Sequence, residues 1–135
     1  MDDNIKKTAL YDYHKEHSNN VIDFSGFFLP IFYSSILEEH QSVRKDAGLF
    51  DVSHMGQILV SGSSSKKFLQ MVTTNDVSKL KKGQAQYSVI CNEEGGIIDD
   101  IIVYKRESDY MLVVNASNID RKVKWLKSFK TKQIK

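Results

Sequence analysis

The sequence predicts an α+β fold in which helices pack on one face of an antiparallel sheet. Two observations carry this prediction. From Gly56 onward the hydrophobic pattern changes period in the order β-α-β-β-β-α. A turn-rich segment at 92–96 then joins two of the strands as a hairpin, and a second turn near 107–108 leads into the next strand.

The N-terminal part is predicted to contain short extended pieces and one helix. Residues 1–33 hold brief apolar patches punctuated by Gly26 and Pro30, which indicates loop and short extended structure. Ser35 and Glu38 then have the spacing of a capping box, in which the serine hydroxyl accepts from a first-turn N–H and the glutamate reaches back. Apolar residues follow at helical spacing, and Gly48 suits a left-handed stop, so a helix is predicted at 35–47.

The remaining elements follow from the same periodicities. The predicted strands are 57–61, 85–91, 97–105 and 110–115. One predicted helix holds Phe68, Leu69 and Val72. Another is capped by Asn118 and holds Ile119, Val123 and Leu126 on one face. A βαββαβ unit would return one more strand after the last helix. We therefore expect a face or an edge of the sheet to lack its cover.

Composition excludes several classes of protein. The 135 residues suffice for one compact domain, or for a small domain with an attached piece, and the hydrophobic fraction of 41% is ordinary. A formal net charge of +2 is too small to indicate a nucleic-acid-binding face. The single cysteine, Cys91, excludes an intrachain disulfide. Because no apolar segment is long enough to span a bilayer and no signal peptide is evident, we expect a cytoplasmic protein without a membrane partner.

Two neighbouring acids interrupt the apolar run GGIIDDIIVY at 95–104. Side chains alternate across a strand, so Asp99 shares a face with Ile97 and Ile101, whereas Asp100 lies on the opposite face with Tyr104. A buried carboxylate is costly unless it is paired, hydrogen-bonded or protonated. The pattern by itself favours a structural interpretation, in which one acid faces solvent and the other caps a turn or pairs with a lysine.

The other polar candidates have ordinary structural explanations. His54, in the segment DVSHMG, could be a base, a ligand or a structural hydrogen-bond donor. No second histidine or cysteine lies at metal-ligand spacing, so no metal site is predicted. Tyr87 and Asn115 lie on predicted strands, where tyrosine packing and an asparagine turn are common. Gly95 and Gly96 are turn residues without a phosphate-loop pattern.

Six longer segments carry a family resemblance. They are LYDYHKEH (10–17), VIDFSGFFLPIFYSS (21–35), EEHQSVRKDAGLFDVSHMG (38–56), TNDVSKLKKGQAQYSV (74–89), NEEGGIIDDIIVYK (92–105) and LVVNASN (112–118). In this order they resemble the N-terminal portion of the glycine cleavage system T proteins, the aminomethyltransferases, from about residue 9 to about residue 127. DVSHMG and NEEGGIIDDIIVYK are long and specific.

The resemblance implies an activity and a site. T proteins move the aminomethyl carbon from the lipoyl arm of H protein to tetrahydrofolate, the acceptor substrate, and release ammonia. The second acid of the GGIIDD motif, Asp100, would be the catalytic residue. The folate cavity would use Met55, Tyr87, Tyr104 and Asn115. Asp99, on the other face, would keep a structural role and pair across the hairpin.

The resemblance also implies a domain division and an incomplete site. Residues 1–55 would be the N-terminal segment of the first T-protein domain, and 56–135 the ferredoxin-like second domain without its last strand. The family's GWxMP segment is GFFLP here, at 26–30, which keeps apolar bulk. Family members are more than twice this length and carry a later Glu and Arg that grip the pterin, so we expect the 135 residues alone to be inactive.

Other functions stay open at this point. A folate-binding relative without transferase activity, such as an iron–sulfur assembly factor, is one alternative. A demethylating dehydrogenase with a T-like region, or a remnant kept only as an interaction module, is another. DVSHMG together with the double aspartate favours the T protein.

Overall fold

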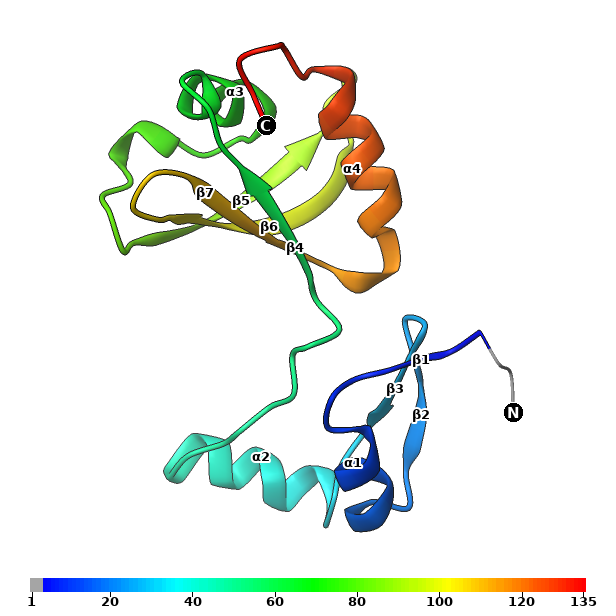
Figure 1. Ribbon diagram of the computed structural model, residues 1–135. Coiled ribbons are helices and arrows are strands. Elements are labelled where there is room, and N and C mark those ends of the chain that lie inside the picture. Colours follow the sequence, from blue (N-terminus) through cyan, green and yellow to red (C-terminus); the bar gives the residue numbers. More distant parts are fainter. Residues whose placement is uncertain (1–3) are drawn as a thin grey trace. The chain divides into compact units, whose positions relative to one another are not determined.

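A computed structural model describes residues 4–135, apart from the side chain of Asn118 (Figure 1). The chain forms two compact units, Met1–His54 and Met55–Lys135. Each contains helices and a sheet with antiparallel pairing, which confirms the predicted α+β class. Across the described residues, no helix combines the length and the apolar character needed to cross a membrane.

The N-terminal unit contains a small sheet and two helices. The strands β1 (Lys6–Lys7), β2 (Val21–Phe24) and β3 (Phe27–Pro30) lie in the order β1-β3-β2, and the helices are α1 (Tyr11–His17) and α2 (Ile36–Lys45). The short extended pieces were predicted, but α1 was not. Its N-cap residue is Leu10, and no side chain bonds the helix start, so the usual sequence signal of a helix is missing.

The predicted cap of α2 is half correct. The Ser35 hydroxyl accepts a hydrogen bond from the Glu38 N–H at 3.2 Å, as expected. The reciprocal carboxylate is Glu39, which accepts from the N–H groups of Tyr33 and Ser34 at 2.5 and 2.8 Å. The left-handed stop at Gly48 is wrong, because α2 ends at Lys45 and φ of Gly48 is not positive. A Cβ on Gly48 would lie 2.5 Å from a Val43 methyl, so a glycine at this position lets the Val43 side chain approach the backbone closely.

The C-terminal unit is a four-stranded antiparallel sheet with two α-helices. Its strands are β4 (Gly56–Val60), β5 (Ala85–Cys91), β6 (Ile97–Lys105) and β7 (Tyr110–Val114), its helices are α3 (Ser65–Val72) and α4 (Ile119–Ser128), and two short 3-10 helices lie at Val77–Lys79 and Ala116–Asn118. The strand order is β4-β7-β6-β5. The four strands were predicted within about a residue, and both α-helices were predicted, although α3 ends at Val72 and not at the predicted Asn75–Asp76. The predicted cap of α4, the Asn118 side chain, lies outside the described residues.

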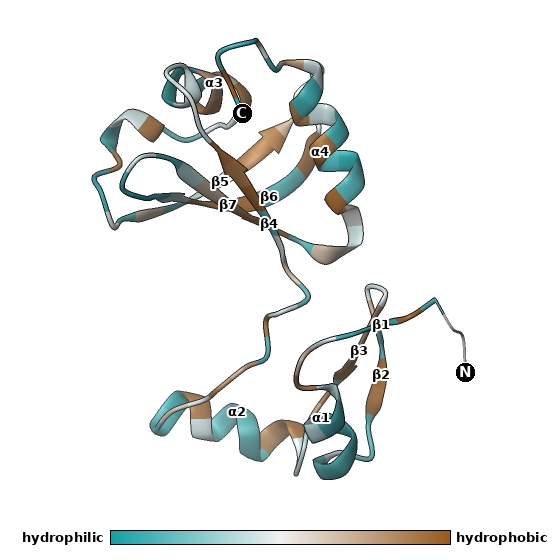
Figure 2. Cartoon of the chain, in the orientation of Figure 1, coloured by the Kyte–Doolittle hydropathy of each residue, from teal (hydrophilic) through white to brown (hydrophobic). Residues whose placement is uncertain are grey.

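The two faces of this sheet differ. On one face, Phe68 and Leu69 of α3 and Leu126 of α4 pack with strand residues such as Val103 and Leu112 in a core that is at most 5% exposed. The strands are largely hydrophobic in Figure 2, whereas α4 alternates between hydrophobic and hydrophilic residues. We call the other face the open face. By cross-strand register it carries Gln57, Leu59, Tyr87, Val89, Asp100, Ile102, Tyr104, Met111 and Val113.

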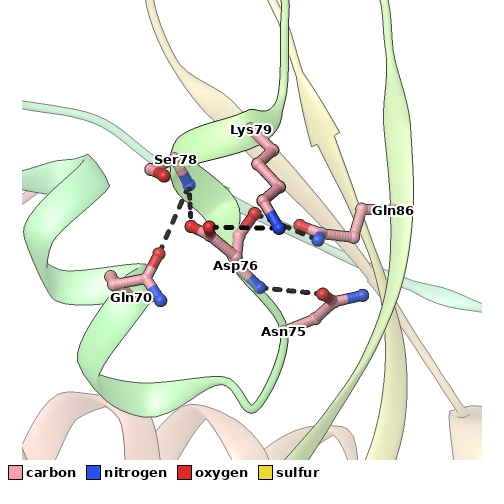
Figure 3. A network of polar contacts seen from close by, with 6 residues as sticks. All are labelled: Gln70, Asn75, Asp76, Ser78, Lys79 and Gln86. Atoms are coloured by element: carbon pink, nitrogen blue, oxygen red, sulfur yellow. Dashed lines mark hydrogen bonds and ion pairs between the residues drawn. The ribbon is translucent and has the colours of Figure 1, made fainter.

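A polar network fixes the connection between α3 and β5 (Figure 3). Asp76 accepts from the Ser78 N–H at 2.9 Å, and its own N–H donates to the Asn75 side chain at 2.8 Å. Gln86 on β5 donates to the Asp76 carbonyl at 3.1 Å. The Asn75 amide donates in turn to the Tyr87 carbonyl at 2.9 Å. These bonds anchor the strand that carries Tyr87 on the open face.

The edge of the sheet beside β4 is partly paired. After α4 the chain turns back, and Lys135 exchanges both backbone hydrogen bonds with Ser61, at 2.9 and 3.0 Å. Ile134 is 5% exposed and joins the core. The expectation of an uncovered edge is therefore wrong at Ser61, although no strand follows α4 in the part of the chain that the structure describes.

Gly62 is expected to be essential for this return of the chain. Its φ is +107°, and a Cβ there would collide with the Gln133 carbonyl oxygen. Gly62→Ala should cost about 2–4 kcal/mol, because it combines left-handed strain with loss of Ile134 burial. Urea unfolding followed by Trp125 fluorescence measures this cost. Gly83→Ala is the matched control. The φ of Gly83 is +78°, and no atom lies within 4 Å of an added Cβ, so this variant measures the cost of the backbone strain without a collision. Equal losses in the two variants would exclude the collision.

Candidate functional site

Asp100 lies on the open face between Asn115 and Tyr87. It is exposed, and its carboxylate accepts from the Asn115 side-chain amide at 2.8 Å. Asn115 directly follows β7, on one side of β6. Tyr87 comes from β5, on the other side. Desolvation raises the pKa of Tyr87, and the charge of Asp100 and a hydrogen bond to it raise this pKa further. Three of the five predicted site residues are therefore brought into direct interaction.

Asp99 lies on the covered face, as the alternation of side chains predicts. Its side chain is 11% exposed and forms an ion pair with Lys122 of α4, whose side chain is 0% exposed. The expected pairing across the hairpin is wrong, because the partner comes from a helix beneath the sheet. The Asn115 amide also donates to Asp99, at 3.0 Å. One amide nitrogen thus joins the two acids around the end of the sheet.

Met55 lies at the same end of the sheet as Asp100. Gly56 pairs with Val114 in the β4–β7 ladder, so Met55 and Asn115 occupy neighbouring places just beyond that pair. Ile101 also pairs with Val114, which puts Asp100 beside Asn115. Met55, half-buried, is therefore placed near the acid by register.

Tyr104 is separated from this group. It lies on the open face four residues along β6 from Asp100, which is about 13 Å of strand. No described contact joins the two side chains. Four of the predicted site residues therefore gather at one end of the open face, and Tyr104 lies toward the other end.

Lys122 is the polar residue at the site that sequence reasoning missed. It follows Ile119 by three positions and precedes Leu126 by four, so helical spacing places it in the apolar stripe of α4. A lysine in such a stripe is unusual, since lysine is almost never fully buried unless it is paired. That signal was available in the sequence and pointed to a buried partner.

The DVSHMG segment contributes to the packing of the N-terminal unit. The His54 ring lies edge-on to Phe24 and Phe27, with centroid distances of 5.5 and 6.3 Å. Its Nδ1 is buried and has no hydrogen-bond partner among the described residues. Asp51 contacts His14, at 2.7 Å. Residues 4–135 contain no group of three or more His, Cys, Asp or Glu side chains that could hold a metal ion.

The chemistry of the open face follows from its residues. Asp100 is a carboxylate that solvent can reach, oriented by the Asn115 amide and flanked on the open face by apolar side chains such as Val89 and Ile102. Leu59 is 55% exposed and Tyr87 61% exposed, so this surface can accept a flat apolar group. A positioned carboxylate can stabilise positive charge or accept and return a proton.

The chain resembles known aminomethyltransferases over nearly its whole length. Residues 10–134 match the family described as GCVT N-terminal domain. An aminomethyltransferase of Halalkalibacterium halodurans is 52% identical over 123 residues, which cover 90% of this chain and 34% of that protein. One from Thermoanaerobacter pseudethanolicus is 50% identical over 129 residues, covering 95% of this chain and 35% of that protein.

The fold agrees with these sequence matches. The crystal structure of glycine cleavage system aminomethyltransferase T from Bartonella henselae matches with a TM-score of 0.89 and 34% identity. The match covers 97% of this chain and 37% of that chain. The protein described here thus spans about a third of the length of the relatives it matches. From its sequence and its fold, the chain belongs to the GCVT N-terminal domain family of aminomethyltransferases.

Proposed function

We propose that this chain carries the catalytic carboxylate of a tetrahydrofolate-dependent aminomethyltransferase of the glycine cleavage system. The donor would be the aminomethyl group on the lipoyl arm of H protein, and the acceptor substrate would be tetrahydrofolate. The cytoplasm would be its location. The observation that supports this proposal best is the position of Asp100, which is exposed on an apolar face and held by the Asn115 amide.

The reaction needs a group that can manage protons and positive charge. The donor's C–S and C–N bonds break, and two C–N bonds to the folate nitrogens replace two N–H bonds. One of the released protons leaves with the amine as ammonia, and the other ends on the lipoyl sulfur. The Asp100 carboxylate can stabilise positive charge near the reacting nitrogen and carry a proton to the leaving amine, directly or through water. Because the Asn115 amide fixes its orientation, little reorganisation is needed.

The open face offers a surface for the acceptor. Leu59, Ile102 and Tyr104 present apolar or aromatic side chains along the face that holds Asp100. We propose that Met55, Tyr87, Tyr104 and Asn115 contact the folate. The spacing between Asp100 and Tyr104 suits a long ligand lying along β6. Residues 1–55 would belong to the first domain of the complete enzyme and 56–135 to the second.

A chimera tests this function. The 123 matching residues of this chain would replace the corresponding segment of the Halalkalibacterium halodurans aminomethyltransferase, which supplies the other two thirds of the enzyme. We expect the chimera to form methylenetetrahydrofolate from aminomethyl-loaded H protein. Asp100→Asn in the chimera should lower kcat by roughly 10²- to 10⁴-fold, the usual contribution of a positioned acid–base group.

Three controls make this test decisive. Thermal unfolding and tetrahydrofolate titration show whether each chimera is folded and binds the acceptor. A folded chimera that binds tetrahydrofolate but forms no product would refute the transferase proposal and favour a folate-binding relative without activity. Full activity of the Asp100→Asn chimera would refute the role of Asp100. The 135-residue chain alone is expected to form no product, and turnover by it would show that the missing portion is dispensable.

A further inference from the structure

Lys122 is buried in an environment that normally excludes charge. Its side chain is 0% exposed, and it lies in the same helical stripe as Leu126. The ammonium pairs with the Asp99 carboxylate and donates to the backbone carbonyl oxygen of Asn115 at 2.7 Å. Burying a lysine and an aspartate together is expensive, and an apolar pair of similar volume often stabilises a fold as well or better. The packing of α4 therefore does not explain why this residue is charged.

The contacts of Lys122 lead to the candidate catalytic acid. Asp99 accepts from the Asn115 amide at 3.0 Å, and the same amide nitrogen donates to Asp100 at 2.8 Å. An asparagine amide has two N–H donors in a fixed fork. When one donor is held by Asp99 on the covered face, the other is directed at Asp100 on the open face. Lys122 therefore fixes Asn115 in two ways. It binds the backbone carbonyl of Asn115 directly, and it holds the side-chain amide through Asp99.

We propose that Lys122 is a positioning residue for Asp100. It lies on the covered face, away from any ligand on the open face, and acts through Asp99 and Asn115. Without it the Asn115 amide would no longer have a fixed direction, and Asp100 would lose its oriented amide donor. The effect on catalysis rests on the proposed function of Asp100, whereas the effect on Asn115 does not.

Two variants separate this role from folding. Lys122→Met removes the ammonium and leaves Asp99 buried without its counter-ion, so this single variant is expected to be strongly destabilised. Lys122→Met combined with Asp99→Leu removes both charges and keeps the space filled, so it should fold. Lys124→Met is the matched control, because Lys124 is an exposed lysine of the same helix.

The first measurement is the water-exchange rate of the Asn115 side-chain amide, by NMR of the ¹⁵N-labelled 135-residue chain. We expect the double variant to exchange roughly fivefold faster or more, as the loss of a hydrogen bond predicts, with the control unchanged. Backbone amide exchange at Leu112 reports on global stability. An unchanged Asn115 rate in a folded double variant would overturn the proposal.

The second measurement is turnover by the chimera described above. The double variant should lower kcat roughly 10- to 100-fold with little change in KM for tetrahydrofolate, because an oriented group and not a ligand contact is lost. An unchanged kcat would overturn the catalytic part of the inference. If Asp100→Asn itself left turnover intact, the proposed function would fail, whereas faster Asn115 exchange would still establish that the buried Lys122–Asp99 pair orients this amide.

Discussion

Asp99→Asn is expected to destabilise the C-terminal unit by about 3–5 kcal/mol, whereas Asp100→Asn should change its stability by less than about 1 kcal/mol. The two acids are adjacent in sequence but differ in environment. Removing the Asp99 charge leaves the Lys122 ammonium, at 0% exposure, without its counter-ion. Asp100 is exposed and its donors can also bond an asparagine oxygen. Since a small domain is stable by about 5–15 kcal/mol, the Asp99 loss would be a large share of the total.

Urea unfolding followed by Trp125 fluorescence measures both variants, because the chain's one tryptophan lies in α4 beside Phe129. The midpoint of Asp99→Asn should fall clearly and that of Asp100→Asn should stay near the wild-type value. Equal midpoints would contradict the assignment of Asp99 to the buried pair. Together with the chimera kinetics, the two variants should differ in their main effect: Asp99→Asn mainly lowers stability and Asp100→Asn mainly lowers the rate.

Local signals account for what the sequence could predict. The β5–β6 hairpin has its turn chemistry within five residues: Gly95 has φ +82°, and the Asn92 side chain accepts from the Gly96 N–H at 2.6 Å. The strands on either side alternate with period two, which placed Asp99 and Asp100 on opposite faces. Helix α3 has a strong apolar stripe, and Phe68, Leu69 and Val72 are buried as expected.

The features that depend on long-range contacts could not be predicted from the sequence. Lys122 is 23 residues from Asp99, and no local pattern states which buried lysine meets which buried acid. Helix α1 has no capping side chain, and its only buried residue is His14, which is held by Tyr33 and Asp51 from distant segments. The fold class and the faces of the strands follow from local periodicity, but the polar partners depend on the tertiary structure.

Acid is expected to unfold the N-terminal unit through Asp51. Leu29 is the only buried hydrophobic residue among the described residues up to His54, so polar contacts hold much of this unit. His14 is 2% exposed; its Nε2 lies 2.7 Å from Asp51 and its Nδ1 2.6 Å from the Tyr33 hydroxyl. Burial would raise the pKa of the Asp51 carboxyl, but hydrogen bonds from Ser53 and His14 outweigh it and hold this pKa well below its usual range.

The direction of this shift fixes the pH range. A carboxyl whose pKa is lower in the folded state contributes its full stabilisation above the unfolded pKa, near 3.9. The contribution is lost as the pH falls below about 4, because the unfolded state takes up a proton that the folded state resists. Hydrogen exchange by mass spectrometry, read on peptides from each unit, should therefore show the N-terminal unit opening between about pH 4 and pH 2.

Asp51→Asn should remove this acid dependence and lower stability at neutral pH by about 2–3 kcal/mol, the range for hydrogen bonds to a charged group. A unit of this size with one buried hydrophobic residue has little stability to spare, so the variant is expected to exchange fast in the N-terminal unit at every pH. Asp46→Asn is the matched control, since Asp46 is exposed at the end of α2. If Asp51→Asn retained the wild-type acid profile, another group would have to hold the unit together, and the His14 cluster would be an ordinary packing contact.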